Sequence, residues 1–383
     1  MYKKVNAHYL YELGKNLMKF SVDRESLLKP IQQVSGVVER RQALPILQNL
    51  LLEIQNGKLL ITGTDLEIEL KTYVEVFAEE DGLVTVPARK LFDICKEIPD
   101  QAKIDFSLKQ NRLELKSGRF RSTLSTLPAE DFPTFDESEP NLTVEADAKE
   151  FKLLLDKTSF AMAHQDVRFF LNGMLIESGQ NFLRAVATDG HRLALSNIQQ
   201  AGLNEKEVQV IVPRKAVLEL QRLLPELGGS VKIEFSQANL KVLSDSYTFA
   251  TKLVDGKFPD YQRVIPKDGS KVVLAERDEL RQALNRTSIL SNEKFRGIRL
   301  NLSNAQLELS ANNPEQEEAE ESISVDYQGE ELQIGFNVSY LQDVLNVVDN
   351  EKVKITLHDS NSSAILEDPD VDQFLYVVMP MKL

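Results

Sequence analysis

The sequence predicts an α+β protein built from three tandem domains of one fold. The chain has 383 residues, 42% of them hydrophobic and 27% charged, which suits a globular protein of two or three domains. A motif centred on Asp65 recurs at Asp189 and, in altered form, at Asn313, each time 124 residues further along. Short alternating strands and amphipathic helices follow one another in the same order in each copy. A regular tandem repeat is therefore the feature that organises the chain.

The first copy begins at Met18 and contains two halves, each a strand, a helix and three strands. Residues 1–17 lie outside the repeat and are interpreted as an N-terminal extension, although a short helix packed on the first domain is an open alternative. Asn56-Gly57 is a strong hairpin signal between two of the strands. The expected strands are 19–22, 50–54, 58–62, 66–76, 83–86, 103–108, 112–116 and 120–124, and the expected helices begin near Asp23 and span 88–98.

The second and third copies keep the register of the first. Pro87 and Pro213 are separated by 126 residues, as are Phe132-Pro133 and Phe258-Pro259. Their helices are expected over 148–158, 214–224, 277–287 and 337–348. Short acidic or proline-bearing joins over 136–140 and 266–270 place the domains at 18–138, 139–266 and 267–383.

Charge is distributed unevenly. The net charge is −14, yet the expected repeat helices together carry more basic than acidic residues. If these helices share one side, their cations could contact a polyanion backbone without reading sequence. The alternative is that they are solvated helix faces with compensating acids. The candidate cations are Arg24, Lys29, Arg41, Arg89, Lys90, Lys149, Lys152, Arg214, Lys215, Arg222, Arg277 and Arg281.

Several classes of protein are disfavoured by the composition. No apolar run is long enough for a membrane helix, and the single Cys95 together with the lack of a secretory signal favours the cytoplasm. The four histidines have no metal-ligand spacing, and the acidic run 315–321 lacks the alternation of a calcium loop. We expect no metal and no cofactor. A hydrolase that uses Asp189 and His191 is kept as the alternative to a non-catalytic binding protein.

The second copy departs from the first directly after the shared Thr-Asp pair. His191, Leu193 and Leu195 stand where the first copy has Glu67, Glu69 and Lys71. Alternate residues of a strand share a face, so an apolar patch is expected on the second copy alone. Gly190 could mark a bulge that shifts the register. The patch and the apolar C-terminal segment 376–383 together suggest a site for a partner peptide.

Residues 18–383 resemble the bacterial sliding clamp family, the beta subunits of DNA polymerase III. The motifs that carry the resemblance are Leu44-Pro45-Ile46-Leu47, Gly63 to Glu67, Val86 to Lys90, Ala163 to Arg168, Leu171 to Leu175, Ala187 to Leu193, Phe258 to Tyr261, Leu290 to Gly297, Ala311 to Glu321 and Val377 to Leu383.

The resemblance implies a ring-shaped head-to-tail homodimer that encircles double-stranded DNA, with helices inside and sheets outside. It implies a non-catalytic processivity factor for DNA replication, which binds DNA independently of sequence and has no membrane role. The clamp would tether the polymerase catalytic subunit, the clamp loader, repair polymerases and other clamp-motif proteins through a peptide-binding cleft.

The same resemblance implies three groups of site residues. The cleft would comprise Leu171, Thr188, Gly190, His191, Arg192, Leu193, Pro259, Arg263, Val264, Asn337, Tyr340, Ser363, Val377, Val378, Met379, Pro380, Met381, Lys382 and Leu383. DNA contacts would fall on Arg41, Arg89, Gln165 and Phe169, to which the charge pattern adds Arg214. The dimer interface would use Ile289 and Leu290, with Glu317, Glu318 and Glu321 facing Lys90 and Arg121 of the other chain. Phe169 stands where the family often has Tyr, and Asn361 and Lys382 where Val and Arg are expected.

Overall fold

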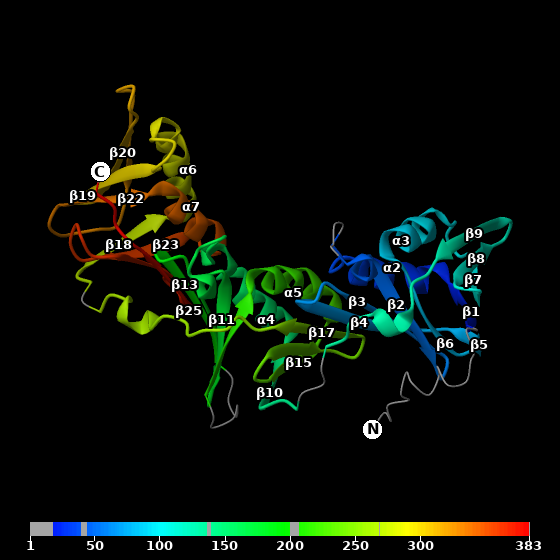
Figure 1. Ribbon diagram of the computed structural model, residues 1–383. Helices are drawn as coiled ribbons and strands as arrows, with labels where there is room; N and C mark the ends of the chain where they lie inside the picture. The colour runs from blue at the N-terminus through cyan, green and yellow to red at the C-terminus, as the bar shows by residue number, and fades with distance from the viewer. Residues whose placement is uncertain (1–17, 40–43, 136–138, 200–206, 268, 383) are drawn as a thin grey trace. The chain divides into compact units, whose positions relative to one another are not determined.

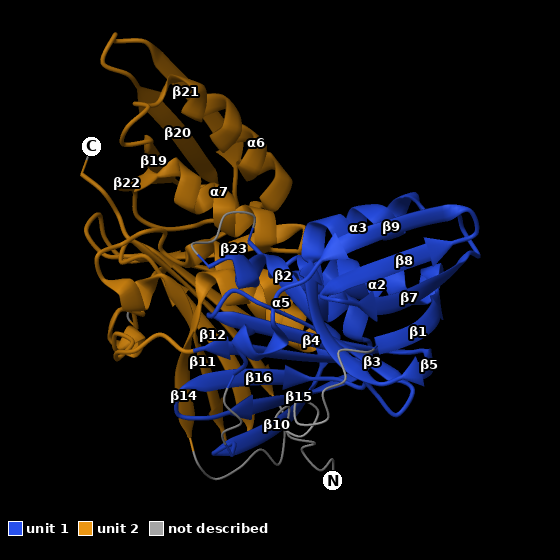
Figure 2. Cartoon of the chain, turned by 45° about the vertical axis from the view of Figure 1, so that its right-hand side comes forward, with its two compact units in different colours: residues 1–149, 222–252 blue, residues 150–221, 253–383 orange. Residues whose placement is uncertain are grey.

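A computed structural model describes residues 18–39, 44–135, 139–199, 207–267 and 269–382. The predicted extension 1–17, Arg41 and Leu383 lie outside the described residues. The chain divides into two compact units, residues 1–149 with 222–252 and residues 150–221 with 253–383 (Figure 2). The division falls within the second repeat copy, so each unit contains part of that copy.

The first unit contains two antiparallel sheets (Figure 1). The five-stranded sheet has the order β5 (Phe77–Glu80), β1 (Met18–Asp23), β7 (Lys103–Lys109), β8 (Arg112–Ser117) and β9 (Phe120–Ser125). The eight-stranded sheet has the order β10 (Leu142–Asp147), β15 (Ser230–Phe235), β16 (Asn239–Leu243), β17 (Tyr247–Lys252), β4 (Ile68–Glu75), β3 (Lys58–Thr64), β2 (Asn49–Gln55) and β6 (Gly82–Pro87). Helices α2 (Arg24–Ser35) and α3 (Ala88–Glu97) pack against each other.

The second unit repeats this plan. Its eight-stranded sheet has the order β14 (Val208–Pro213), β11 (Gly173–Gly179), β12 (Phe182–Thr188), β13 (Arg192–Gln199), β25 (Val371–Val378), β24 (Ala364–Asp368), β23 (Lys352–Leu357) and β18 (Lys271–Glu276). The four-stranded sheet has the order β21 (Glu318–Ser324), β20 (Gln306–Asn312), β19 (Gly297–Ser303) and β22 (Leu332–Asn337). Helices α6 (Arg277–Thr287) and α7 (Val338–Val347) pack together, whereas α4 (Ala148–Asp156) and α5 (Arg214–Leu227) cross the division between the units.

The two halves of every copy exchange their first strands. In the first copy β1 pairs with β7 and β6 pairs with β2, so each leading strand joins the three strands of the other half. The second copy does the same through β10 with β15 and β14 with β11. The eight-stranded sheets then join neighbouring copies, through β17 with β4 and β13 with β25. The predicted order of strand, helix and three strands is confirmed. The order of the elements does not by itself specify which strands pair, so the exchange of first strands could be seen only in the structure.

Most of the expected elements form close to their predicted limits, and their apolar faces are buried. Leu27, Ile31 and Val34 lie on the buried face of α2, and Cys95 is buried on α3. The expected strand 66–76 is wrong in its limits. Residues 66–67 belong to a turn, and the chain forms a separate short strand, β5, after Val76. Pro225 lies inside α5, which continues past the predicted end to Leu227.

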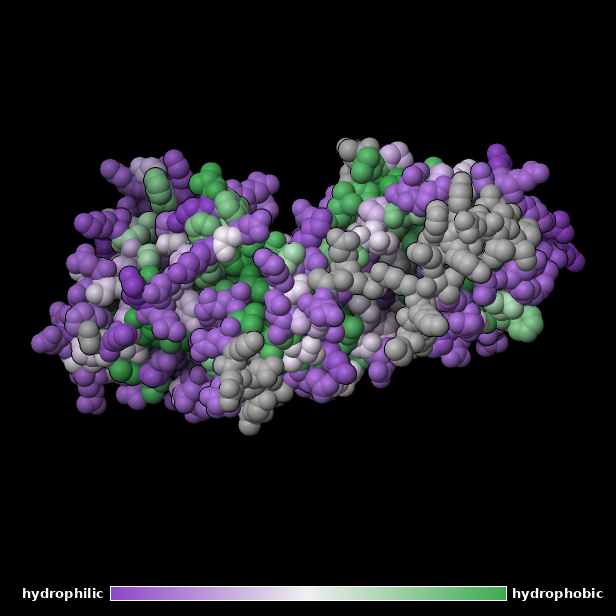
Figure 3. All heavy atoms as spheres, turned by 60° about the horizontal axis from the view of Figure 1, so that its bottom comes forward, coloured by the Kyte–Doolittle hydropathy of each residue, from purple (hydrophilic) through white to green (hydrophobic). Residues whose placement is uncertain are grey.

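The apolar patch expected on the second copy forms from Leu193 and Leu195, but these side chains pack into the core and His191 is not part of it. Strand β13 begins at Arg192, so His191 belongs to the preceding turn. Leu193 is 3% exposed and belongs to a buried cluster, against which the half-buried Leu195 packs. On the face shown in Figure 3, hydrophilic side chains predominate and apolar ones surface in separate patches. No helix among the described residues is long and apolar enough to span a membrane.

Candidate functional site

A cavity of about 250 Å³ opens in the second unit between the eight-stranded sheet and the segment that follows β17. Its wall is mostly apolar, with a few polar side chains at the rim, as is typical of ligand pockets. The lining residues are Arg168, Phe170, Leu171, Thr188, Gly190, Arg192, Leu193, Pro259, Asp260, Tyr261, Val264, Val377 and Met379.

The floor of this pocket is part of the sheet core. Leu193 of β13 lies directly opposite Val377 of β25 and Thr188 of β12 in the strand register. Leu193 and Val377 pack in one buried cluster with Leu175, Val186, Ile211, Phe258 and Tyr261. The floor is therefore apolar and is held by backbone pairing on both sides.

The turn between β12 and β13 is closed by its own side chains. The Thr188 hydroxyl donates to the Arg192 carbonyl at 2.6 Å, and the Gly190 amide donates to that hydroxyl at 3.1 Å. Asp189 Oδ1 accepts the amides of His191 and Arg192 at 2.9 and 3.0 Å. Gly190 has φ of +89°, a backbone conformation that favours glycine over other residues. The predicted bulge at Gly190 is in fact this turn.

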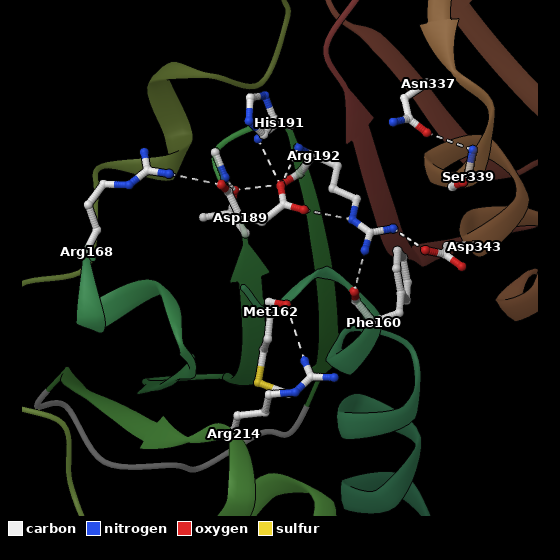
Figure 4. Close-up of polar contacts among 12 residues, drawn as sticks. Phe160, Met162, Arg168, Asp189, His191, Arg192, Arg214, Asn337, Ser339 and Asp343 are labelled. Carbon is white, nitrogen blue, oxygen red and sulfur yellow. Dashed lines mark hydrogen bonds and ion pairs between the residues drawn. The ribbon is translucent and has the colours of Figure 1, made fainter. Parts of the chain in front are cut away.

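Arg192 lines the pocket and its guanidinium links several elements (Figure 4). Its guanidinium pairs with Asp189 at 3.2 Å and with Asp343 of α7, and it donates to the Phe160 carbonyl at 2.8 Å. The guanidinium also lies 5.3 Å from the Phe160 ring centre and 4.6 Å from that of Tyr340. These contacts fix the start of β13 relative to α7.

His191 projects from the turn rather than toward Asp189. Its exposed imidazole stacks on Tyr340 with ring centres 6.3 Å apart and an interplanar angle of 15°. Burial raises the pKa of the Tyr340 hydroxyl, so this ring stays neutral at physiological pH. Because Asp189 is engaged by backbone amides and Arg192, the two side chains do not form the acid and base pair that a hydrolase would need.

Arg168 forms part of the pocket rim beside Gly190. It pairs with Asp166 at 2.9 Å and donates to the Asp189 carbonyl at 3.2 Å. The Arg168 guanidinium holds the pKa of Asp166 down to about 2, so the pair remains charged throughout the physiological range. The rim therefore presents a fixed cation next to an apolar floor.

The C-terminal segment forms another edge of the pocket. The Met379 amide donates to the His191 carbonyl at 2.9 Å, and the Met381 amide donates to the Gly335 carbonyl at 2.8 Å. Met379 lines the pocket and remains partly exposed, whereas Val378 is buried. The chain end is thus tied to the turn of the second copy and to β22.

The structure brings about half of the predicted cleft residues onto one pocket. Those that line it are Leu171, Thr188, Gly190, Arg192, Leu193, Pro259, Val264, Val377 and Met379. The other described members do not line it: His191, Arg263, Asn337, Tyr340, Ser363, Val378, Pro380, Met381 and Lys382. Asn337 instead caps α7 by accepting the Ser339 amide, and Arg263 is paired with Asp260 at 2.7 Å.

Four lining residues were not predicted as part of the cleft: Arg168, Phe170, Asp260 and Tyr261. The chain order offers a signal for them, because each lies within three residues of a predicted cleft residue. That proximity alone does not say which side chains point inward.

The residues predicted to contact DNA are placed separately. Arg89 is exposed on α3 and pairs with Asp93 at 3.1 Å. Gln165 and Phe169 are exposed, the latter by 55%, and Arg214 is half-buried and donates to the Met162 carbonyl at 3.2 Å.

The predicted interface residues are likewise accessible in the single chain. Ile289 is 75% exposed beside Leu290, and Glu317 and Glu318 are exposed at the start of β21. Lys90 and Arg121 are exposed in the first unit. Glu321 differs from the rest because it pairs with Arg286 of its own chain, which lowers the pKa of its carboxyl. Within the described residues no group of acidic, His and Cys side chains could hold a metal ion.

Comparison with known proteins identifies the relatives of this chain. Family models for the N-terminal, central and C-terminal domains of the DNA polymerase III beta subunit match residues 18–136, 145–260 and 262–382. The beta sliding clamp of Pseudomonas putida strain KT2440 is 56% identical over 367 residues, which cover 96% of this chain and 100% of that protein. The beta sliding clamp of Escherichia coli K12 is 50% identical over the same shares of the two chains.

Solved structures agree with these matches. The DNA polymerase III subunit beta from Pseudomonas aeruginosa is 54% identical, with a TM-score of 0.94 over 96% of this chain and 100% of that chain. A sliding clamp from the same organism, bound to griselimycin, has a TM-score of 0.92 at 54% identity and the same coverage. The chain therefore belongs to the beta sliding clamp family, the beta subunits of DNA polymerase III.

Proposed function

We propose that this protein is a DNA sliding clamp, a processivity factor without catalytic activity that encircles duplex DNA and tethers replication and repair enzymes. The observation that carries the proposal is the run of three beta-subunit domain matches along the chain, together with an apolar pocket on the second unit. The hydrolase alternative has no support from the relatives, and the geometry of Asp189 and His191 opposes it.

We infer that the pocket binds a short linear peptide carried by the polymerase catalytic subunit, the clamp loader and repair polymerases. An apolar floor at Leu193 and Val377 would take apolar side chains of the peptide, while the rim cation Arg168 would favour an acidic residue or carbonyl group. His191, Tyr340 and the segment from Val377 to Leu383 would extend the contact outside the cavity. The griselimycin-bound relative supports a ligand site in this family.

We infer sequence-independent contact with DNA phosphates through Arg41, Arg89, Gln165, Phe169 and Arg214. The basic character of helix residues in a chain with net charge −14 supports this assignment. Contacts to phosphate carry no sequence information, which suits a protein that must slide. Phe169 offers an aromatic face but no hydroxyl for such a contact.

We infer a head-to-tail homodimer that closes into a ring, with helices inside and sheets outside. Exposed Ile289 beside Leu290 offers the apolar part of a seam, and the acids Glu317, Glu318 and Glu321 would face Lys90 and Arg121 of the second copy. We further propose domain limits of 18–138, 139–266 and 267–383, and a cytoplasmic location.

Two solution measurements test the proposal. A fluorescein-labelled peptide carrying the clamp-binding segment of the replicative polymerase should bind with rising anisotropy, and unlabelled griselimycin should displace it. Light scattering should give the mass of two chains. A peptide that does not bind, or a monomeric mass at micromolar concentration, would contradict the corresponding part of the proposal.

A further inference from the structure

The second unit contains a buried carboxylate that the pocket itself does not explain. Glu177 of β11 is 6% exposed, and its Oε2 accepts the Tyr261 hydroxyl at 2.6 Å. Gln209 donates to Oε1 at 2.5 Å. Arg184 donates to the Tyr261 hydroxyl at 2.8 Å and lies 3.6 Å from Glu177. We call these four residues, Glu177, Arg184, Gln209 and Tyr261, the Glu177 anchor.

Strand register places three of the four side chains on one face of the sheet. Glu177 is directly opposite Arg184 of β12 and directly opposite Gln209 of β14. Residues two positions along the same strands, Leu175, Val186 and Ile211, belong to the apolar cluster beneath the pocket. The anchor is therefore the polar continuation of the pocket floor.

Tyr261 joins the anchor to the pocket wall. Its ring packs in the apolar cluster and lines the cavity, while its hydroxyl reaches Glu177. It belongs to the segment 253–265, which also contributes Pro259, Asp260 and Val264 to the pocket lining. Tyr261 is therefore a point at which this segment is attached to the sheet, through its ring and its hydroxyl.

The first copy shows how the same segment is held without a pocket-forming floor. At its equivalent positions Glu53 faces Leu60 and Leu83 across the strands, and Phe135 replaces Tyr261, so the anchor is missing. There the Phe135 amide donates to Glu69 Oε2 at 3.1 Å. Glu69 pairs with Thr64 as Leu193 pairs with Thr188, so it occupies the floor position.

The difference between the first and second copies indicates what the Glu177 anchor does. In the first copy the segment is fixed by the floor carboxylate of Glu69, and Glu53 has no tyrosine hydroxyl to accept because residue 135 is Phe. In the second copy the floor is the apolar Leu193, and the segment is held instead through Tyr261 by the buried Glu177 beside the floor. A buried carboxylate is costly unless it is fully hydrogen-bonded, and an apolar side chain at this site would avoid that cost.

We propose that Glu177, with Arg184 and Gln209, is a positioning residue for the peptide pocket. By accepting the Tyr261 hydroxyl, Glu177 holds the segment 253–265 in place beside the apolar floor, so that the floor remains free for the peptide. The inference rests on the proposed peptide-binding function. Peptide affinity therefore depends on side chains that the peptide does not touch.

The test uses the full-length protein with Tyr261→Phe, which removes only the hydroxyl. The matched control is Tyr376→Phe, because the Tyr376 hydroxyl is buried and makes no hydrogen bond with the described residues. The probe is the labelled polymerase peptide. We expect about tenfold weaker binding by Tyr261→Phe and unchanged binding by the control, since a hydrogen bond to a charged group is lost only in the former.

A second pair of variants separates positioning from general stability. Glu177→Gln keeps an acceptor for the Tyr261 hydroxyl and should retain affinity within about threefold, whereas Glu177→Leu should weaken binding about as much as Tyr261→Phe. The double variant Tyr261→Phe with Glu177→Leu should lose no more peptide affinity than either single variant, because both substitutions remove the same hydrogen bond between Tyr261 and Glu177.

The peptide affinities of these variants test the positioning role of Glu177. Wild-type peptide affinity in Tyr261→Phe, or additive losses of affinity in the double variant, would overturn the positioning role. The Tyr261→Phe result can be obtained even if the Glu177→Leu protein does not fold. If the unsubstituted protein binds no peptide, the proposed function itself fails. If it binds and Tyr261→Phe binds equally well, only the positioning role fails.

Discussion

Leu193 is the residue at which the second copy acquires its pocket. It replaces the floor glutamate of the first copy, Glu69, whose carboxylate is buried and pairs with Lys71 at 2.7 Å. An apolar residue at this point leaves the floor without a charged group, so that an apolar side chain can dock without desolvating a charge.

Leu193→Glu should therefore remove peptide binding. The new carboxylate would lie in the apolar cluster of Leu175, Val186 and Val377, and we expect the free energy of unfolding to fall by about 2 kcal/mol or more. Leu218→Glu is the control, because Leu218 is exposed on α5. Anisotropy and chemical denaturation measure both effects, and a Leu193→Glu protein that binds peptide normally would refute the assigned floor.

Cys95 provides a second prediction at this scale. Burial raises the pKa of its thiol to about 12, so at pH 8 the thiol is neutral as well as inaccessible. We expect no labelling by maleimide in the folded protein and complete labelling in denaturant. The unfolding free energy should also decline as pH rises above 9.0, the ordinary value for this thiol, because only the unfolded state then ionises it. Rapid labelling of the folded protein would contradict this.

Part of the site could be predicted from residue types and part could not. The repeat comparison indicated that His191, Arg192 and Leu193 differ from the first copy, and two of these three line the pocket. The partners of Arg192, Phe160 and Asp343, lie far away in the chain, and no local pattern specifies them. Tyr261 was also missed, although the same comparison, applied to Phe135, could have found it. Glu177 gives no such signal, because the first copy also has a glutamate, Glu53, at the equivalent position.

Among the structural elements, the same type of turn precedes β4 in the first copy and β13 in the second, but only the second borders the pocket. Thr64 and Asp65 close the turn before β4 with the same four hydrogen bonds that Thr188 and Asp189 make before β13. Leu66 takes the place of Gly190 and has φ of +80°. The shared Thr-Asp pair is thus structural, and the difference in function begins after it.

The C-terminal segment after β25 can be tested by deletion, because it lies at the end of the chain. Deletion of Met379 to Leu383 should abolish peptide binding, because Met379 lines the pocket and its amide holds the turn at His191. Among the described residues, the deletion removes the backbone hydrogen bonds donated by Met379 and Met381, each worth about 1 kcal/mol, so the fold should survive.

The dimer should also survive this deletion, since the segment lies apart in sequence from the predicted interface residues. Anisotropy measures the peptide, and light scattering measures the mass. A deletion variant that is monomeric, or that keeps its peptide affinity, would contradict the separation of the two sites.

Element order could be predicted because hydrophobic periodicity is local. Helix α6 forms over the predicted residues, and the hairpin at Asn56-Gly57 joins β2 to β3. The exchange of leading strands between halves could not be predicted, since periodicity identifies a strand without naming its partner. The short strand β5 was missed because it follows β4 after the single residue Val76.

At the scale of the whole molecule, the repeat interval carries most of the prediction. Intervals of 124 and 126 residues led to three similar domains, and three beta-subunit domain models match the chain in that order. The eight-stranded sheets give this repeat a physical basis, because each is made from strands of two neighbouring copies. The copies are consequently joined by backbone hydrogen bonds as well as by linkers.

We expect the protein to hold DNA by encircling it rather than by affinity for its surface. The most direct measurement is retention on DNA of different topology: protein loaded by the clamp loader onto nicked circular DNA is separated by gel filtration, before and after the circle is cut once. We predict co-elution with the circle and release after linearisation, because a ring can slide off a free end. Equal retention on the linear DNA would show that the protein does not hold DNA by encircling it.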